Sequence, residues 1–363
     1  MKQIEILVVG GGPAGLCAAL AASSLGAKVL ICERDDHPGG QLVKQTHKFF
    51  GSEKQYAGDR GFQIGDMLLE KVQADENIEL WVDTTVLGIY DDGVVTCEHD
   101  NQHVKIKPER IVIATGAAEK FLPFPGNDLP GVYGAGAVQT LMNVSGVKPA
   151  DRVLMVGAGN IVLIVSYQLK QAGVEVAAII EGAPKIGGYL VHASKDVRSG
   201  IPVLTSHTIL EAYGKDRVEG AIICKLDEKW QPIPGTEEDV KCDVICLAVG
   251  LSPLTELCWQ AGCEMAFIRE LSGHVPIVDD YLETTVPGIY VAGDVSGIEE
   301  ASSAMVEGRL AGLSAAASLG YGKEEAPALQ KAAMTELDEL RAGPMGEKIR
   351  LGLEKVAAKG GAK

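Results

Sequence analysis

Two copies of a glycine-rich fingerprint constrain the fold of this chain more than any other feature. The first copy occupies residues 10–15 (GGGPAG), and Glu33 ends the apolar run that follows it. The second copy occupies residues 157–162 (GAGNIV), and Glu181 ends its apolar run. Each copy lies within a strand–turn–helix–strand pattern of about 30 residues, the context that a dinucleotide-binding motif requires. Two such units in one chain predict two Rossmann-like domains, each with its own bound dinucleotide.

The three glycines of the first copy have different physical roles. Gly10 permits the tight turn, Gly12 lets the backbone approach a pyrophosphate, and Gly15 lets helix and strand pack closely. The phosphates are expected at the N-terminus of the helix, where free N–H groups and the helix dipole favour negative charge. Glu33 is placed to hydrogen-bond a pair of ribose hydroxyls.

The second copy departs from this pattern at its third position, where Val162 replaces glycine and is expected to crowd the contact between helix and strand. Gly157 and Gly159 remain, so a phosphate can still approach the backbone. Glu181 would repel a 2′-phosphate and therefore favours NAD(H) over NADP(H), although Lys185 follows a few residues later. Two interpretations stay open for this motif, a working NAD site and a structural relic.

Composition and hydropathy exclude several classes of function. The formal net charge of -16 argues against a nucleic-acid partner. The longest apolar stretch, residues 153–167, is interrupted by glycines and is too short to span a bilayer. The first apolar run, residues 4–9, leads directly into the glycine motif, so it is predicted as a strand and not as a secretory signal. We therefore expect a cytoplasmic protein without a membrane span.

The eight cysteines form no C-x-x-C pair and show no metal-site spacing. Reduced, buried thiols are the expectation, with no metal or iron–sulfur site in this chain.

Four motifs in order together resemble a known family. They are the first fingerprint with Glu33, an Ala-Thr-Gly turn at residues 114–116, the second fingerprint, and an Ala-Gly-Asp turn at residues 292–294. The set is similar to the two-dinucleotide-binding-domain flavoproteins of the pyridine nucleotide-disulfide oxidoreductase superfamily. The resemblance covers about residues 1–321 and the size is that of the thioredoxin-reductase-like members.

The resemblance implies an α/β fold with two Rossmann-like FAD/NAD(P)-binding domains, the second inserted in the first. The expected FAD-binding domain comprises residues 1–117 plus 276–321, and the expected NAD(P)-binding domain comprises residues 118–275. Residues 322–363 form a tail rich in Ala, Glu and Lys that is predicted to be helical. A solvated helix face and a docking surface for a partner subunit both stay open for this tail.

The same resemblance implies the residues that bind each nucleotide. Those expected to contact FAD are Gly10, Gly12, Pro13, Ala14, Gly15, Glu33, Arg34, Gly40, Gln41, Val86, Ala114, Thr115, Gly116, Gly293, Asp294, Ala301 and Ser302. Those expected to contact NAD are Gly157, Gly159, Asn160, Ile161, Glu181, Val249 and Gly250. The helix that begins near residues 299–302 is expected to point its N-terminus at the flavin N1–C2=O edge and to stabilise the charge of reduced flavin.

No catalytic residue is assigned, because hydride transfer needs positioning and not a protein nucleophile. His47 and His192 are candidates for a role beside the flavin and the nicotinamide, and packing roles are the alternatives.

The redox cysteines of the superfamily are missing. Thioredoxin reductases carry a C-x-x-C just before the second glycine motif, where residues 134–144 read GAGAVQTLMNV. Glutathione-reductase-like members carry theirs just after the first Gly-Gly pair, where residues 39–51 contain no cysteine. Disulfide reduction is therefore not expected.

A closer resemblance is to the FAD/NAD subunits of the hydrogen cyanide synthase, opine oxidase, dye-linked proline dehydrogenase and heteromeric sarcosine oxidase groups. It rests on residues 122–126 (LPFPG), 129–132 (LPGV), 134–139 (GAGAVQ) and 299–309 (EEASSAMVEGR). Some of those subunits end in a cysteine-rich iron–sulfur module, which we do not expect in this chain.

The resulting hypothesis is an FAD-dependent oxidoreductase that transfers a hydride between NAD(H) and FAD as a subunit of a multi-component dehydrogenase. The expected assembly is a homodimer, or a hetero-oligomer with a dehydrogenase or iron–sulfur subunit that exchanges electrons with it. A small-molecule substrate is compatible with this role. The alternatives are a stand-alone NAD(P)H–ferredoxin reductase and a non-catalytic subunit that binds nucleotide only to organise a complex.

Overall fold

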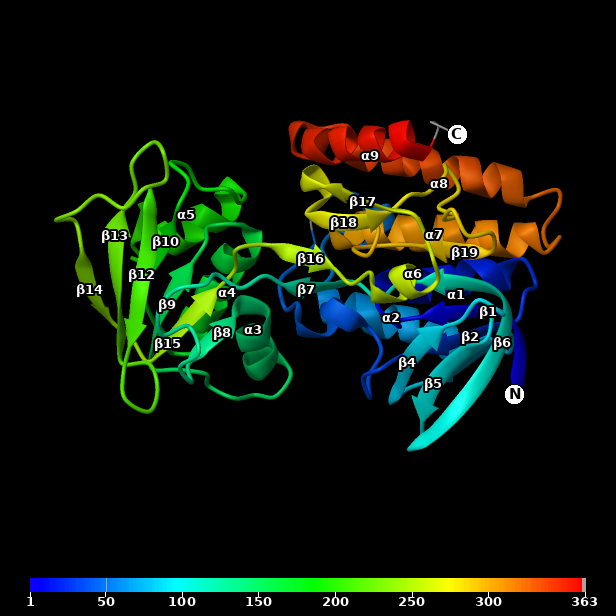
Figure 1. Ribbon diagram of the computed structural model, residues 1–363, viewed down its shortest axis with the longest axis horizontal. Helices are drawn as coiled ribbons and strands as arrows, with labels where there is room; N and C mark the ends of the chain where they lie inside the picture. The colour runs from blue at the N-terminus through cyan, green and yellow to red at the C-terminus, as the bar shows by residue number, and fades with distance from the viewer. Residues whose placement is uncertain (50, 361–363) are drawn as a thin grey trace. The chain divides into compact units, whose positions relative to one another are not determined.

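A computed structural model describes residues 1–49 and 51–360 of the chain (Figure 1). The chain forms two compact units, one made of Met1–Ala118 with Leu251–Lys363 and the other of Glu119–Gly250. We refer to them as unit 1 and unit 2. The chain returns to unit 1 at Leu251, earlier than the boundary at residue 276 that the sequence suggested. The reason is that β16 (Leu251–Pro253) pairs with β7 (Ala117–Glu119), a contact between distant parts of the chain.

Unit 1 is built on a seven-stranded sheet in the order β3-β2-β1-β6-β5-β4, with β19 also paired to β6. Its strands are β1 (Lys2–Val9), β2 (Val29–Cys32), β3 (Ile78–Trp81), β4 (Thr84–Ile89), β5 (Val95–His99), β6 (Gln102–Ile113) and β19 (Ile289–Val291). The end of β6 runs parallel to β1 and β19, and its beginning runs antiparallel to β5. The strands β2 and β19 are buried along their whole length, which explains their unbroken apolar sequences.

Small residues bring the two central helices of unit 1 close together. These helices are α1 (Pro13–Ser24) and α7 (Ala301–Ser318). A Cβ atom added to Gly308 would lie 2.0 Å from the carbonyl oxygen of Ala14, and one added to Gly312 would lie 2.1 Å from that of Ala18. The backbones therefore touch directly, without side chains between them.

The other elements of this unit are η1 (Gly40–Lys44), η2 (Glu53–Gln55), α2 (Gly61–Gln73), α6 (Glu256–Gln260) and the β17 (Met265–Ile268), η3 (Arg269–Leu271) and β18 (Gly273–Pro276) segment.

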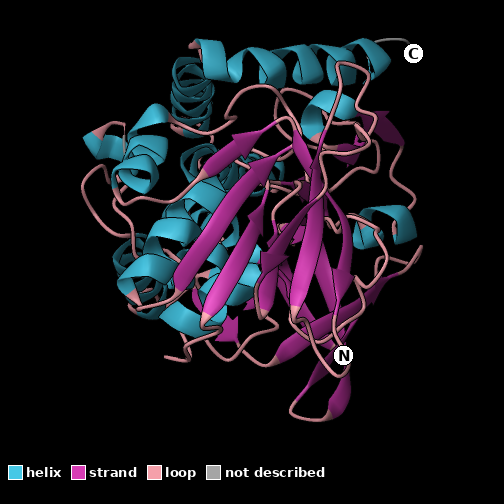
Figure 2. Cartoon of the chain, turned by 90° about the vertical axis from the view of Figure 1, so that its left-hand side faces the viewer, coloured by secondary structure: helices cyan, strands magenta, loops and turns pink. Residues whose placement is uncertain are grey.

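Unit 2 repeats this plan on a smaller scale, and its strands face the viewer in Figure 2. A parallel sheet has the order β11-β10-β9-β15-β8. Its strands are β8 (Val132–Gly134), β9 (Arg152–Val156), β10 (Glu175–Glu181), β11 (Val203–Thr205) and β15 (Val244–Leu247). The helices are α3 (Ala135–Asn143), α4 (Asn160–Gln171) and α5 (Leu190–Arg198), and an antiparallel sheet contains β12 (His207–Tyr213), β13 (Gly220–Lys225) and β14 (Glu238–Lys241). The α/β class predicted from the sequence is confirmed.

The C-terminal tail packs within unit 1. It contains α8 (Ala326–Arg341), η4 (Pro344–Gly346) and α9 (Glu347–Gly360). In α8, Ala333 and Leu337 pack against Val306 and Leu310 of α7. In α9, Val356 joins a second apolar cluster with residues of β17, η3 and β18. Each tail helix thus has a buried face that contacts its own chain.

Within residues 1–49 and 51–360, no helix is long and apolar enough to cross a membrane. The same residues include no group of three or more His, Cys, Asp or Glu side chains arranged to hold a metal ion. All eight cysteines are free thiols, and only Cys17 is not fully buried. Burial raises the pKa of Cys17 and Cys242 to about 12, so both thiols stay protonated near neutral pH.

Candidate functional site

The first glycine turn connects β1 to α1 with a backbone that excludes side chains. Gly10 has a φ of 103°, and a Cβ atom there would lie 2.5 Å from the carbonyl oxygen of Ala114. A Cβ atom on Gly15 would lie 1.8 Å from the carbonyl oxygen of Gly10. Both positions require glycine for the fold itself, whatever the turn binds.

Gly12 is different because no protein atom fills the space beside it. The nearest atom to an added Cβ is the Cα of Gly40, at 3.9 Å. Gly12 is the N-cap of α1 and no side chain caps the helix there. The first N–H groups of α1 therefore face an open cradle, which suits the pyrophosphate of a dinucleotide.

Glu33 is held rigidly at the edge of this cradle. Its side chain is 7% exposed; Oε2 accepts a hydrogen bond from the N–H of Gly11 at 2.6 Å, and Oε1 accepts one from the N–H of Asp35 at 2.8 Å. Each carboxylate oxygen has a second lone pair, so the group can still accept from ribose hydroxyls. Arg34 points to solvent and pairs with Asp35 at 3.5 Å.

A second glycine pair closes the turn. The N–H of Gly39 donates to the carbonyl oxygen of Gly11 at 2.8 Å, and a Cβ on Gly40 would lie 2.9 Å from the Cα of Gly12. Gln41 follows in η1 and is exposed. Val86 is half-buried on β4, which is distant in sequence from this turn but belongs to the same unit.

The Ala-Gly-Asp turn also approaches the glycine turn of unit 1. A Cβ on Gly293 would lie 2.9 Å from the Cβ of Ala14, so these distant segments are in contact. Burial raises the pKa of Asp294 to about 6; the backbone N–H of Glu299 opposes this increase, and the carboxylate of Glu299 adds to it. No side chain caps the N-terminus of α7, which begins at Ala301. Ser302 lies buried in the first turn of this helix.

The Ala-Thr-Gly turn follows β6 in the same unit. Ala114 is buried, and Thr115 donates its hydroxyl proton to the carbonyl oxygen of Leu254 at 2.7 Å. Gly116 has a φ of 75°, and an added Cβ would meet no atom within 4 Å. Together with Pro13, the expected FAD residues of this region lie in unit 1.

The turn in unit 2 reproduces the geometry of the first turn. Gly157 has a φ of 107°, and a Cβ there would lie 2.5 Å from the carbonyl oxygen of Ala248. A Cβ on Gly159 would meet no atom within 4 Å. Glu181 accepts hydrogen bonds from the N–H groups of Ala158 at 2.7 Å and Ala183 at 2.8 Å. The carboxylate of Glu181 is thus bound by two backbone N–H groups in positions equivalent to those that bind Glu33.

The crowding expected at Val162 is not observed. The side chain is fully buried in the apolar cluster between α4 and the sheet. A Cβ on Gly157 would lie 3.6 Å from its Cγ2, an ordinary contact distance. The first helical hydrogen bond of α4, from Leu163 N–H to the carbonyl oxygen of Gly159, is retained at 3.2 Å. The helix accommodates valine without loss of the turn.

Sequence reasoning missed a contact that closes the second turn. The N–H groups of Gly187 and Gly188 both donate to the carbonyl oxygen of Ala158, at 3.1 and 2.9 Å. The side chain of Asn160 accepts from the N–H of Tyr189 at 2.8 Å. The available signal was the repeat of Gly-Gly-x-Leu at residues 39–42 and 187–190. Ile161, Val249 and Gly250 are exposed in this unit.

The two candidate histidines lie in different units. His47, in unit 1, is half-buried and stacks on Phe49 with ring centroids 6.1 Å apart. His192, in α5 of unit 2, is buried, and its ring lies 6.4 Å from that of Tyr189. Burial, followed by the charge of Lys195, lowers the pKa of His192. Neither contact assigns a chemical role to these side chains.

Asp196, also in α5, is an unusual buried acid. Its side chain is fully buried, and neither carboxyl oxygen has a hydrogen-bond partner. Burial raises its pKa from 3.8 to about 7, with a smaller opposing effect from Lys195. The native state therefore binds a proton here over a pH range in which the unfolded chain does not.

We expect Asp196→Asn to stabilise the protein at pH 8 and to stabilise it less at pH 5, since the effect grows between the unfolded pKa near 3.8 and the folded pKa of about 7. A carboxyl whose pKa is raised on folding contributes stability below its unfolded pKa, and this contribution is lost as pH rises through the folded pKa. The difference in unfolding free energy between the two proteins should change by roughly 2–4 kcal/mol across this range. Urea unfolding at both pH values measures it. Asp338→Asn, at an exposed position of α8, is the control, and equal pH profiles for all three proteins would contradict the assignment.

Comparisons with known protein sequences identify a family and several relatives of this chain. The sequence profile described as pyridine nucleotide-disulphide oxidoreductase matches residues 4–308. The A subunit of opine oxidase from Agrobacterium tumefaciens (strain Ach5) is 31% identical over 87% of this chain and 66% of that protein. The HcnB subunit of hydrogen cyanide synthase from Pseudomonas aeruginosa is 27% identical over 86% of this chain and 70% of that protein. The chain spans about two thirds of the length of the opine oxidase protein.

Solved structures show the same fold. L-proline dehydrogenase from P. horikoshii superimposes with a TM-score of 0.69 at 24% identity, covering 92% of this chain and 59% of that one. Thioredoxin reductase from T. acidophilum superimposes with a TM-score of 0.71 at 22% identity, covering 88% of this chain and 99% of that one.

Proposed function

The chain belongs to the pyridine nucleotide-disulphide oxidoreductase family, and from this premise we propose that it transfers a hydride between NAD(H) and FAD as a subunit of a multi-component dehydrogenase. One observation carries the proposal. Each unit contains a glycine turn in which the glycine before the helix, Gly12 or Gly159, has open space beside it. Each unit also has a glutamate whose carboxylate accepts hydrogen bonds from two backbone N–H groups. One chain thus has two cradles suited to the pyrophosphate and ribose of a dinucleotide.

The cradle in unit 1 supports FAD as its ligand. Gly12 leaves the uncapped N-terminus of α1 open for phosphates, and Glu33 is fixed to accept from ribose hydroxyls. Gly40 lies against Gly12, and Gly293, which precedes Asp294, lies against Ala14 at the start of α1. The uncapped N-terminus of α7 supplies further N–H groups and a positive dipole end in the same unit. These residues would hold the ribityl and pyrophosphate parts of FAD.

The cradle in unit 2 supports NAD(H) over NADP(H). The carboxylate of Glu181 is fixed by the N–H groups of Ala158 and Ala183, so it cannot easily turn away from the ribose. A 2′-phosphate beside it would meet like-charge repulsion. Lys185 is exposed and outside this pair of hydrogen bonds. Gly187 and Gly188 close this turn as Gly39 closes the first.

FAD, when bound, supplies the two-electron chemistry that accepts a hydride from NADH or returns one to NAD⁺. The chain binds and orients the two nucleotides, and no side chain needs to act as a nucleophile. The disulfide chemistry of the superfamily has no support at its usual positions, because residues 39–51 and 134–144 contain no cysteine.

The relatives support a role within an assembly. The similar proteins from opine oxidase, hydrogen cyanide synthase and sarcosine oxidase are all named as subunits. The chain covers only 33% of the alpha subunit of sarcosine oxidase from Corynebacterium sp. (strain P-1). We therefore propose that a dehydrogenase or iron–sulfur partner exchanges electrons with the flavin of this chain and that the partner contributes the site for an organic substrate.

An anaerobic titration tests the proposal. The purified, FAD-loaded chain is titrated with NADH and then with NADPH while the flavin absorbance is followed. We expect NADH to bleach the flavin at near-stoichiometric amounts and NADPH to require a large excess, because of Glu181. Absence of bleaching by either nucleotide, with NADH binding intact by calorimetry, would overturn hydride transfer and leave a nucleotide-binding subunit.

A further inference from the structure

The tail helix α8 ends in an arginine, Arg341, whose side chain is largely buried and binds two glutamates with little exposure. Arg341 forms a fork on Glu299, with Nη2 to Oε1 at 2.6 Å and Nε to Oε2 at 3.1 Å. Its Nη2 also donates to Oε1 of Glu307. The three side chains are 11%, 9% and 6% exposed. Glu299 lies just before α7 and Glu307 lies within it, so one arginine of the tail binds both sides of the start of α7.

Glu307 also binds the segment that contains the Ala-Gly-Asp turn. Its Oε2 accepts hydrogen bonds from the N–H of Gly293 at 2.8 Å and from the hydroxyl of Ser296 at 3.1 Å. The N–H of Glu299 lies 3.5 Å from Oδ1 of Asp294. The segment 293–300 is therefore fastened at both ends to carboxylates that Arg341 holds. This segment carries Asp294 and leads into the uncapped N-terminus of α7.

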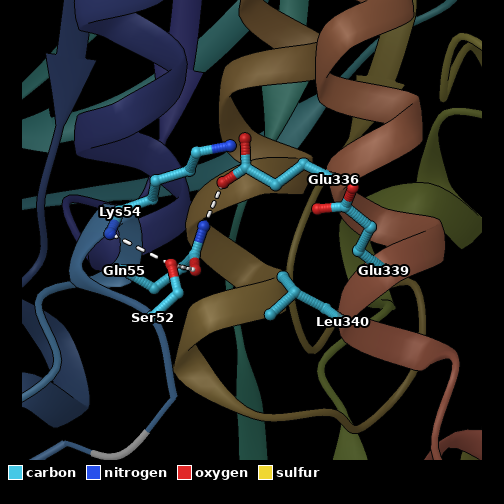
Figure 3. A pocket seen from close by; sticks show the side chains of 6 residues that line it. All are labelled: Ser52, Lys54, Gln55, Glu336, Glu339 and Leu340. Carbon is cyan, nitrogen blue, oxygen red and sulfur yellow. Dashed lines mark hydrogen bonds between the residues drawn. The ribbon is translucent and has the colours of Figure 1, made fainter.

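A second contact of α8 reaches another segment of unit 1. Glu336 accepts hydrogen bonds from Gln55 of η2 and from Arg309 of α7. Figure 3 shows Gln55 and Glu336 joined across a pocket of about 330 Å³, lined by Ser52, Lys54, Gln55, Glu336, Glu339 and Leu340. η2 lies a short distance along the chain from the Gly39–Gly40 pair. The helix α8 thus bridges the segment after Gly40 and the helix after Asp294.

The charges explain why the arginine is needed. Burial raises the pKa of Glu307 to about 7, with an opposing effect of Arg341 and a further increase from Glu299. Two buried carboxylates face a single guanidinium. Removal of that guanidinium would leave them uncompensated, which is strongly unfavourable for buried ions. Either Glu307 would take up a proton or the segment 293–300 would move to reach water.

From this arrangement we infer that Arg341 is a positioning residue for the flavin site, and that α8 is a brace which holds segment 293–300 and the start of α7 in the geometry that binds FAD. The inference rests on the proposed assignment of FAD to unit 1. It gives the C-terminal tail a role within its own chain. The ionic contacts that support this role involve residues outside both glycine fingerprints.

The test compares Arg341→Met with the wild-type chain in three measurements: the dissociation constant of FAD, the midpoint potential of the bound flavin and the melting temperature of the FAD-free protein. We expect FAD to bind on the order of tenfold more weakly and the flavin potential to shift, since the positive end of α7 is displaced. Arg341→Lys, which keeps the charge but not the fork, should recover part of the affinity. Lys331→Met makes the same charge change at an exposed position of α8 and should bind FAD normally.

Separate outcomes distinguish the brace from the site. A lower melting temperature with unchanged FAD affinity and unchanged potential would overturn the brace and reduce Arg341 to a stabilising contact. Asp294→Ala serves as the positive control; if it loses FAD affinity while Arg341→Met does not, only the brace fails. If Gly12→Val and Asp294→Ala both retain FAD normally, the site assignment itself fails, and the brace with it. Should Arg341→Met not fold, Glu299→Gln removes one of the two carboxylates that Arg341 binds, and normal FAD affinity in that variant would overturn the brace.

Discussion

Replacement of Gly12 with valine is expected to give a folded protein that no longer retains FAD. The backbone of Gly12 has an extended conformation that valine adopts readily, and the nearest atom to an added Cβ is 3.9 Å away. The side chain would instead fill the space in front of the first N–H groups of α1, where the pyrophosphate needs direct backbone contact. We expect FAD affinity to fall by at least about a hundredfold, or roughly 3 kcal/mol. Flavin content per protein and calorimetric titration of the apoprotein measure this.

Gly159→Val is the matched variant in unit 2. It places the same side chain in the equivalent turn, where an added Cβ meets no atom within 4 Å. This variant should retain FAD while losing the bleaching by NADH. The opposite pattern, with flavin lost from Gly159→Val and kept by Gly12→Val, would exchange the two assignments. Full flavin content and a full NADH response in both variants would refute both cradles.

The second large effect is expected where α1 and α7 touch. An added Cβ on Gly312 would lie 2.1 Å from the carbonyl oxygen of Ala18, so even alanine forces the helices apart. In an ordinary helix, glycine to alanine stabilises by about 1 kcal/mol. Here the sign should reverse, with a loss of at least about 3 kcal/mol, because the core is overpacked and a backbone contact is broken. Gly308→Ala should behave alike, since its Cβ would lie 2.0 Å from the carbonyl oxygen of Ala14.

Urea unfolding followed by circular dichroism measures this change. Gly343→Ala is the control, because an added Cβ there meets nothing within 4 Å and the free energy of unfolding should stay within about 0.5 kcal/mol of the wild type. If Gly312→Ala is as stable as Gly343→Ala, the close helix contact is not the one that holds unit 1 together. Reduced flavin retention should accompany the loss, because α1 and α7 both begin at the proposed FAD cradle.

Local motifs carried the fold class and most of the proposed cradles. The pairs Gly10 with Glu33 and Gly157 with Glu181 are recognisable in the sequence. In each pair the turn, the start of the helix and the acidic end of the next strand lie within about 30 residues. The physical requirement is local, so the sequence states it directly. The family resemblance drawn from these motifs is confirmed by the profile match over residues 4–308. The individual binding residues stay predictions.

Val162 shows where local reasoning failed. The consensus glycine at this position avoids a clash in unit 1, where a Cβ on Gly15 would lie 1.8 Å from Gly10. In unit 2 the helix lies far enough from the turn for Val162 to be buried in the core with ordinary contacts. The distance between helix and strand depends on the whole packing of a unit and cannot be inferred from the turn.

The sequence by itself determined two Rossmann-like units and the place of each glycine turn, because these depend on residues close together in the chain. Only the tertiary structure decided that Arg341 of the tail reaches Glu299 and Glu307, that Gly308 and Gly312 meet α1, and that the chain returns to unit 1 at Leu251. These contacts join segments far apart in sequence, and no local pattern specifies them. They form because buried charges need partners and because closely packed helices leave no room for side chains.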